Sequence, residues 1–288
     1  MHTYTLIDTF LVAAPLVVVP ATRPLLPADR FPRAPIVLAA AVCFAAAFAF
    51  DHPGAAALLT LPWLAVAVWT ATAVVVDACR RRVWRLDALA LVAAHAFLVV
   101  GAFFVCASRA GWVVAGIHEP IVELTGVHFH YAGFAAMVLA LCVARAQNVP
   151  RAAVLAMLGV GIVGPPAVAA GFEWGVALFQ IGGATLMTAF TWTIAALTML
   201  FVVRASSGSA RALLVASSLA VLAPMVLAVM WATSQYYDVR ALTIPQMARV
   251  HGTINALGFV GCGIAGWRLR YADLRSSTTR VQRSGSER

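Results

Sequence analysis

Residues 116–134 read GIHEPIVELTGVHFHYAGF, and the assignment of this stretch decides the fold of the whole chain. It places three histidines and two glutamates among apolar residues. If its first half is a membrane span, every later loop changes sides. If it is a segment at the membrane surface, the loops alternate regularly. The rest of the sequence distinguishes these two assignments.

The composition is that of an integral membrane protein. Of the 288 residues, 62% are hydrophobic and 11% are charged, and the mean hydropathy is +0.91, whereas soluble domains are roughly 45–50% apolar and ~25% charged. About 20 apolar residues cross the hydrocarbon core of a bilayer. On that scale the sequence predicts nine spans, at 5–21, 35–50, 55–76, 87–107, 129–144, 152–171, 176–203, 212–235 and 250–267.

The arginines predict the orientation, because cytoplasmic loops carry an excess of positive charge. All 20 basic residues are arginine. With the N-terminus outside and the C-terminus inside, every one lies on the inner side except Arg109, Arg240 and Arg249. Counting 111–127 as a span would reverse this pattern from Arg145 onward. We therefore expect 111–127 to be an outer-face segment, either an interfacial helix or a re-entrant lid.

The net charge of +9 is thus a topology signal that favours contact with membrane lipids and gives no evidence for a nucleic-acid partner. The sequence predicts one transmembrane helical domain over 1–270. Residues 271–288 are rich in Arg and Ser, and we expect them to form a disordered cytoplasmic tail. The five cysteines have no metal-binding spacing.

Polar residues that are uncommon in a membrane cluster near the outer ends of the predicted spans. They are Asp8, Glu119, Glu123, His128, His130, Tyr131, Gln180, His251 and Asn255. His95 is the exception, near the midplane of its span. Because ionisable groups in a bilayer usually face a cavity or one another, this distribution predicts an outward-facing polar chamber. His128 and His130 would point about 200° apart on a regular helix, so we predict neither a metal site nor a cofactor.

Three stretches, EPIVELTGVHFHYAGF, TFLVAAPLVVVP and HGTINALGF, resemble the YndJ-like family of bacterial polytopic membrane proteins. The resemblance follows the order of segments over most of the chain, and the first and last stretches are the specific ones. It implies a multi-span bundle in a bacterial cell membrane. It also implies that the family's polar positions are Glu119, His128, His130, Tyr131, His251 and Asn255. The family is described only as transporter-like.

The predicted chamber favours an enzyme that acts on a hydrophobic, isoprenoid or lipid-like molecule. A carboxyl group removed from water favours its protonated form and is then a general acid. The specific hypothesis is a membrane-bound terpene cyclase that protonates its substrate. The candidate catalytic residues are Glu119, Glu123, Asp8, His128, His130 and His251, and the candidate substrate-binding residues are Tyr131, Asn255, His95, Gln180, Trp112 and Phe129. A transporter of a small solute or lipid and a non-catalytic scaffold subunit are the alternatives.

Overall fold

A computed structural model describes residues 6–27, 30–82, 84–206 and 208–286. Within these ranges the chain is helical apart from its loops, and the only β-structure is an isolated bridge between Val114 and Ile117. A bundle of helices is the expected outcome for so apolar a chain, because a helix satisfies its backbone hydrogen bonds internally in lipid. The predicted all-α class is confirmed.

Seven helical segments in the described part of the chain are long and apolar enough to cross a membrane. They are Leu6–Leu25, Pro53–Arg81, Leu86–Ala110, Ile121–Ala144, Arg151–Trp174, Ala177–Ala205 and Gly208–Ser234. Ala34–Ala49 is a shorter apolar helix, as expected for the second predicted span. The ninth predicted span lies in a further helical segment that runs from Ile244 to Ser286.

Several segments combine α-helix with tighter or wider turns. The first contains α1 (Leu6–Ala13), η1 (Ala14–Val18), α2 (Val19–Thr22) and η2 (Arg23–Leu25). The next three contain α3 (Ala34–Ala46) with η3 (Ala47–Ala49), α4 (Pro53–Arg81) and α5 (Leu86–Ala110). The central segment contains α6 (Ile121–His128), η4 (Phe129–Ala135) and α7 (Ala136–Ala144).

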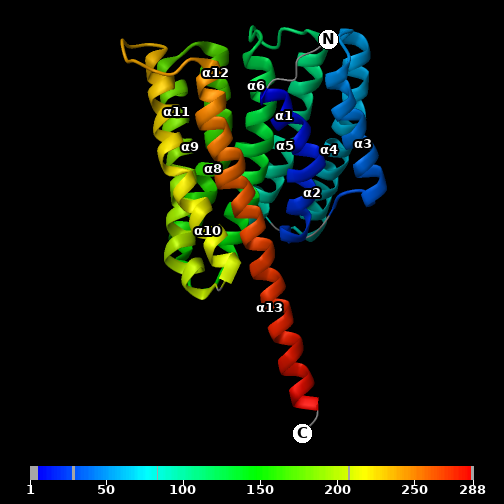
Figure 1. The fold of residues 1–288 in the computed structure, drawn as a ribbon, viewed down its shortest axis with the longest axis vertical. Coiled ribbons are helices and arrows are strands. Elements are labelled where there is room, and N and C mark those ends of the chain that lie inside the picture. The colour runs from blue at the N-terminus through cyan, green and yellow to red at the C-terminus, as the bar shows by residue number, and fades with distance from the viewer. Residues whose placement is uncertain (1–5, 28–29, 83, 207, 287–288) are drawn as a thin grey trace.

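The C-terminal half has the same mixed character. Its elements are α8 (Arg151–Trp174), α9 (Ala177–Leu197), η5 (Thr198–Val202), η6 (Val203–Ala205), α10 (Gly208–Ala220) and α11 (Leu222–Ser234). The last segment contains α12 (Ile244–Met247), η7 (Ala248–Gly252), η8 (Ile254–Gly261) and α13 (Cys262–Ser286). The start of α1 and the end of α13 lie at opposite ends of the molecule (Figure 1), as an odd number of crossings between them requires.

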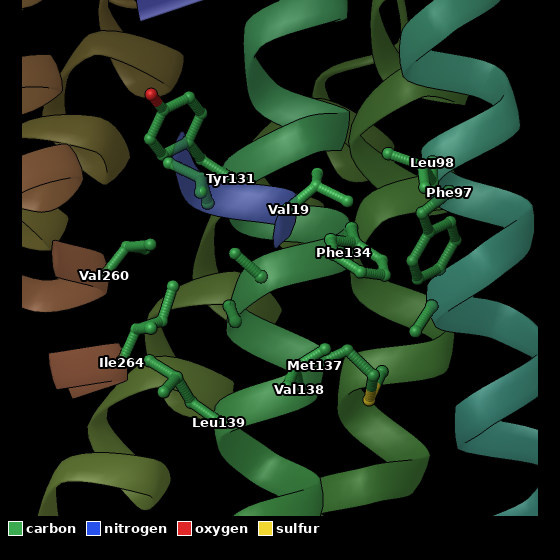
Figure 2. Close-up of a cluster of buried hydrophobic side chains, with 14 of the residues drawn as sticks. Val19, Phe97, Leu98, Tyr131, Phe134, Met137, Val138, Leu139, Val260 and Ile264 are labelled. Carbon is green, nitrogen blue, oxygen red and sulfur yellow. The ribbon is translucent and has the colours of Figure 1, made fainter. Parts of the chain in front are cut away.

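The segment Ile121–Ala144 forms the centre of the bundle. In its most apolar stretch 78% of the residues are buried, against 33–50% in the other six long apolar segments. Figure 2 shows side chains from several elements around it, with Val260 and Ile264 of the last segment facing Leu139. Residues before and after this helix in the sequence therefore cover it on different sides.

The structure corrects the assignment of the predicted outer-face segment at 111–127. Residues 111–120 form a loop, but Ile121–His128 is the first part of the central helix and is neither a separate interfacial helix nor a re-entrant lid. The helix begins here because the Glu119 carboxylate accepts a hydrogen bond from the Glu123 backbone N–H at 3.2 Å, which caps its first turn. The predicted side of the later loops is unaffected, because this helix is still one crossing.

The last helix extends through the region where a disordered tail was expected, since α13 runs to Ser286. The division into a domain over 1–270 and a tail over 271–288 stays a prediction. At the other end of this segment, the wide turns of η8 release the Phe259 carbonyl, which accepts a hydrogen bond from the Ser217 hydroxyl at 2.6 Å. This bond ties the last segment to α10.

Candidate functional site

A cavity of about 260 Å³ lies in the end of the bundle that contains α6 and α12. Its walls come from α1, the central helix, α8, α9, α11 and the last segment, so it joins the two halves of the chain. The lining is mostly apolar, as is usual for a pocket that binds a small molecule. The predicted site residues that line it are His128, Phe129, Tyr131, Gln180, His251 and Asn255.

His128 is held in a defined orientation at the end of α6. Its Nδ1 lies 2.7 Å from the Leu124 carbonyl oxygen. A carbonyl oxygen only accepts, so Nδ1 carries the hydrogen and Nε2 of the neutral ring is left as an acceptor. The side chain is exposed, although it belongs to the most buried helix, because it faces the cavity. It thus presents an available basic nitrogen in apolar surroundings.

His251 reaches the same cavity from η7. Its Nδ1 lies 2.8 Å from the Pro224 carbonyl oxygen, so this ring also carries its hydrogen on Nδ1. The ring centroids of His128 and His251 are 6.5 Å apart and their planes are inclined by 30°. Two neutral imidazoles from distant parts of the sequence therefore lie side by side, each oriented by a backbone carbonyl.

Asn255 completes this polar group. Its Nδ2 lies 3.4 Å from Nε2 of His251 and 3.7 Å from the sulfur of Met225. Its Oδ1 is buried and has no hydrogen-bond partner. A buried acceptor without a donor costs about 1–3 kcal/mol. A molecule with a hydroxyl or amine group would satisfy acceptors of this kind at the cavity wall.

Three of the polar side chains at the cavity come from segments with wide helical turns. Tyr131 lies in η4, His251 in η7 and Asn255 in η8, and all three segments are π-helical. Such turns add a residue per turn and occur frequently at functional sites. They re-aim side chains relative to a regular helix, so Phe129, Tyr131 and Gly133 all line the cavity together with His128.

Two other predicted residues at the cavity are engaged with the protein. The Tyr131 hydroxyl donates to the Phe10 carbonyl oxygen at 3.0 Å, which joins the central helix to α1. The Gln180 side chain is buried and its Oε1 accepts from the Tyr236 hydroxyl at 2.7 Å. These bonds fix the wall and leave the histidines as the more available polar groups.

His130 lies on the other side of the central helix, away from the cavity. Its Nε2 accepts from Trp63 Nε1 at 3.1 Å, and its Nδ1 lies 2.7 Å from the Gly126 carbonyl oxygen. The ring is fully buried and packs against Trp63 and Phe44. Both ring nitrogens are therefore used within the fold, and His130 does not join His128, as the spacing of two residues predicts.

The three carboxyl candidates are also outside the cavity lining. Asp8 and Glu123 lie close enough to interact with each other. Glu119 instead caps the central helix. The expected chamber shared by all the acids and histidines is thus wrong, because none of the three acids lines the cavity.

The remaining predicted residues are separate from the site. His95 is buried in α5, with Nδ1 2.8 Å from the Leu91 carbonyl oxygen and its ring between Phe31 and Phe134. Trp112 is 56% exposed in the loop after α5. Among the described residues no three His, Cys, Asp or Glu side chains are placed to hold a metal ion.

The aromatic pair Phe172 and Trp231 was the main feature of the wall that the sequence did not reveal as a pair. Their rings stack at 6.0 Å between α8 and α11, and both line the cavity. Thr125 and Thr191 also line it. The sequence gave no sign that Phe172 and Trp231 meet, because they lie in different helices that are far apart in the chain.

The fold and the cavity define a polytopic helical membrane protein with a ligand-sized pocket towards one end of its helix bundle. The chain belongs to the YndJ-like family, whose sequence model, described as YndJ-like protein, matches residues 9–259. The expected resemblance is therefore confirmed.

The chain is similar to the uncharacterized membrane protein YndJ of Bacillus subtilis (strain 168). The two are 24% identical over 212 residues, which cover 74% of this chain and 38% of the relative. The chain thus spans well under half the length of this curated relative. No solved structure matches. Membership of this family and the apolar helices identify a multi-pass bacterial membrane protein.

Proposed function

We propose that the protein binds an apolar small molecule in the cavity that contains His128 and His251 and catalyses acid–base chemistry on it. The observation that carries this proposal is the facing pair His128 and His251, each with its Nδ1 on a carbonyl oxygen. An imidazole whose Nε2 is available is a suitable general base. The apolar wall selects a lipid-soluble substrate, of isoprenoid or lipid type.

The specific reaction we propose is protonation-initiated cyclisation of an isoprenoid chain or its epoxide. A proton adds to the substrate at the start, a carbocation forms the new ring, and a base removes a proton at the end, so the isomerisation balances without a cofactor. The stacked rings of Phe172 and Trp231 and the ring of Phe129 offer aromatic faces to a cation. In this proposal His128 removes the final proton.

The proton for such a reaction would come from the Asp8–Glu123 pair. The pair does not line the cavity, but Ile7 and Leu124, which adjoin the two acids in the chain, do. Under the cyclase hypothesis, Glu123→Gln or Asp8→Asn abolishes turnover while the protein still inserts and stays monodisperse. Full turnover in both variants would rule out the acid role and leave only histidine chemistry.

Ligand occupancy of the cavity is tested by organic extraction of the purified protein and mass spectrometry of the extract. We expect an apolar molecule to co-purify with the wild-type protein. Ala228→Phe should remove it, because Ala228 lines the cavity and the added ring fills it. Ala223→Phe is the matched control, since Ala223 is exposed on the same helix, α11, and does not line the cavity. Equal recovery from both variants would contradict the proposal.

Catalysis is tested by comparing lipid extracts of cells with and without the gene, with His128→Gln and His251→Gln as further variants. An enzyme produces a new or modified lipid species that these variants lose. The transporter alternative is favoured by the wide turns of η7 and η8 and by Pro165 at the cavity, which are features of pliable helices. A change in solute uptake with an unchanged lipid profile would establish the transporter and overturn the enzyme.

A further inference from the structure

A second hollow, of about 600 Å³, lies at the opposite, arginine-rich end of the bundle. It is bounded by the end of α4, the start of α5, the end of α7 and the start of α8. Its arginines are Arg30, Arg81, Arg85, Arg145 and Arg151, and its acids are Asp77 and Asp87. It shares no lining residue with the cavity that contains His128 and His251. A molecule that binds here is therefore separate from the proposed function.

The two acids neutralise only part of this positive charge. Asp77 Oδ1 lies 2.9 Å from Arg30 and also 2.9 Å from Arg81, so two guanidinium groups share one carboxylate. Asp87 lies 3.5 Å from Arg85. Even with both acids ionised, the arginines outnumber the carboxylates by five to two.

Arg145 and Arg151 are the two arginines of the hollow that form no ion pair with a described acid. Arg145 Nε donates to the Leu141 carbonyl oxygen at 2.9 Å, and its terminal nitrogen donates to the Leu25 carbonyl oxygen. These partners fix the guanidinium in place without cancelling its charge. Arg151 is exposed, is the first residue of α8, and forms no ion pair with any described acid. A guanidinium in this position is available to an anion.

The rest of the hollow is apolar. Val74, Leu91, Val154, Leu155 and Leu158 form its wall between the helices. Leu155 is 39% exposed, so this wall reaches the outer surface of the bundle, where lipid chains lie. The hollow therefore combines a cationic rim at the end of the helices with a hydrophobic wall that leads into the bilayer. Free phosphate would use only the rim, whereas an anionic phospholipid matches both parts.

We propose that this hollow binds the phosphate group of an anionic phospholipid, with an acyl chain along the apolar wall. Guanidinium groups bind phosphate oxygens through paired N–H donors, and the N-terminus of α8 adds a favourable dipole. Basic pockets between membrane helices on the cytoplasmic side are suited to anionic headgroups. The position of the hollow at the arginine-rich end agrees with this placement.

The test is native mass spectrometry of the full chain, purified in non-ionic detergent and titrated with phosphatidylglycerol, phosphatidylcholine or inorganic phosphate. We expect phosphatidylglycerol to bind more tightly than zwitterionic phosphatidylcholine by roughly tenfold, as one charge-assisted contact implies. Millimolar inorganic phosphate should not displace it. Equal binding of the two lipids would overturn the proposal, and so would a site that takes inorganic phosphate but no phosphatidylglycerol.

The key variant is Arg151→Gln, because Arg151 is exposed and its replacement leaves the packing of the bundle intact. It should weaken phosphatidylglycerol binding roughly tenfold. Arg204→Gln is the matched control, since Arg204 is also exposed near a predicted inner loop but does not line the hollow. An Arg151→Gln protein that binds phosphatidylglycerol as tightly as Arg204→Gln would overturn the assignment, and the unfolding temperature of each variant verifies that both are folded.

Discussion

His128 and His130 show how two residues of the same type acquire different roles on one helix. His128 faces the cavity and keeps an available Nε2, whereas both nitrogens of His130 are bonded within the core. Helical geometry predicts that they diverge, because residues two apart point to different sides. It does not predict which of them faces the cavity. That depends on Trp63 in α4, whose indole N–H requires an acceptor in the core.

Trp63 is expected to contribute to stability through its bond to His130. Trp63→Phe removes the indole N–H and leaves His130 Nε2 as a buried acceptor without a donor. We expect the free energy of unfolding to fall by about 1–3 kcal/mol, measured by denaturant unfolding in detergent. Trp69→Phe is the control, because Trp69 lies on the same helix and is 65% exposed. Equal stability of the two variants would contradict a structural role for His130.

The pairing of Asp8 with Glu123 marks the limit of prediction for single residues. The sequence placed both acids near the outer end of the bundle, from two different spans. It gave no means of determining whether they face the cavity or each other, because that depends on the rotation of α1 against α6. In the structure the two acids interact with each other and neither lines the cavity. Rotation about a helix axis is set by packing with neighbours, which composition and spacing do not encode.

At the scale of elements, the α8–α9 hairpin depends on glycines that allow close backbone contact. A Cβ added to Gly183 would lie 2.6 Å from the Val168 backbone nitrogen, and one added to Gly171 would lie 2.5 Å from the Gln180 backbone. Small residues at such positions let membrane helices approach closely. A Cβ added to the neighbouring Gly182 would meet nothing within 4 Å. The two adjacent glycines of α9 therefore have different roles.

Adjacent glycines in α9 provide a matched pair of variants. Gly183→Ala should lower the free energy of unfolding by about 1–3 kcal/mol, because the added methyl group meets backbone atoms that cannot rotate away. Gly182→Ala should be neutral or slightly stabilising, since nothing lies within 4 Å of its added Cβ and alanine favours helix. Thermal unfolding in detergent distinguishes them. A Gly183→Ala protein as stable as Gly182→Ala would show that α8 and α9 separate without cost.

The boundaries of the predicted spans agree with those of the observed helices where a long apolar run is followed by a polar residue or a glycine. Gly111 and Gly175, both with positive φ, end α5 and α8 near the predicted boundaries. The central helix was predicted to begin too late, at residue 129, because the arginine count excluded 111–127 as a separate span. Residues 121–128 were therefore not joined to the span that follows them. The wide turns of η4, η7 and η8 left no recognisable sequence pattern, since they arise from local hydrogen bonding within an otherwise ordinary helix.

For the whole molecule, the two cavities are lined by residues from opposite ends of the bundle: α6 and α12 line one, and the end of α4 and the start of α5 line the other. The charge distribution predicts that the arginine-rich end faces the cytoplasm. Cysteine labelling in intact cells tests this orientation, after the five native cysteines have been replaced. Tyr237→Cys, at a position that is 61% exposed beyond α11, should react with a membrane-impermeant maleimide. Arg204→Cys should react only after the cells are opened, and the reverse pattern would invert the orientation.

The burial of the central helix has a consequence for the biogenesis of the protein. Ile264 lies beside Leu139 in Figure 2, so part of the covering of this helix comes from a segment that leaves the ribosome well after it. Until that segment enters the membrane, one side of the helix that carries His128 is uncovered and contacts lipid or the insertion machinery. His251 arrives with the same late segment. The pocket therefore forms only after residues 244–261 have been synthesised, and a ribosome that stalls after residue 234 would release a protein without it.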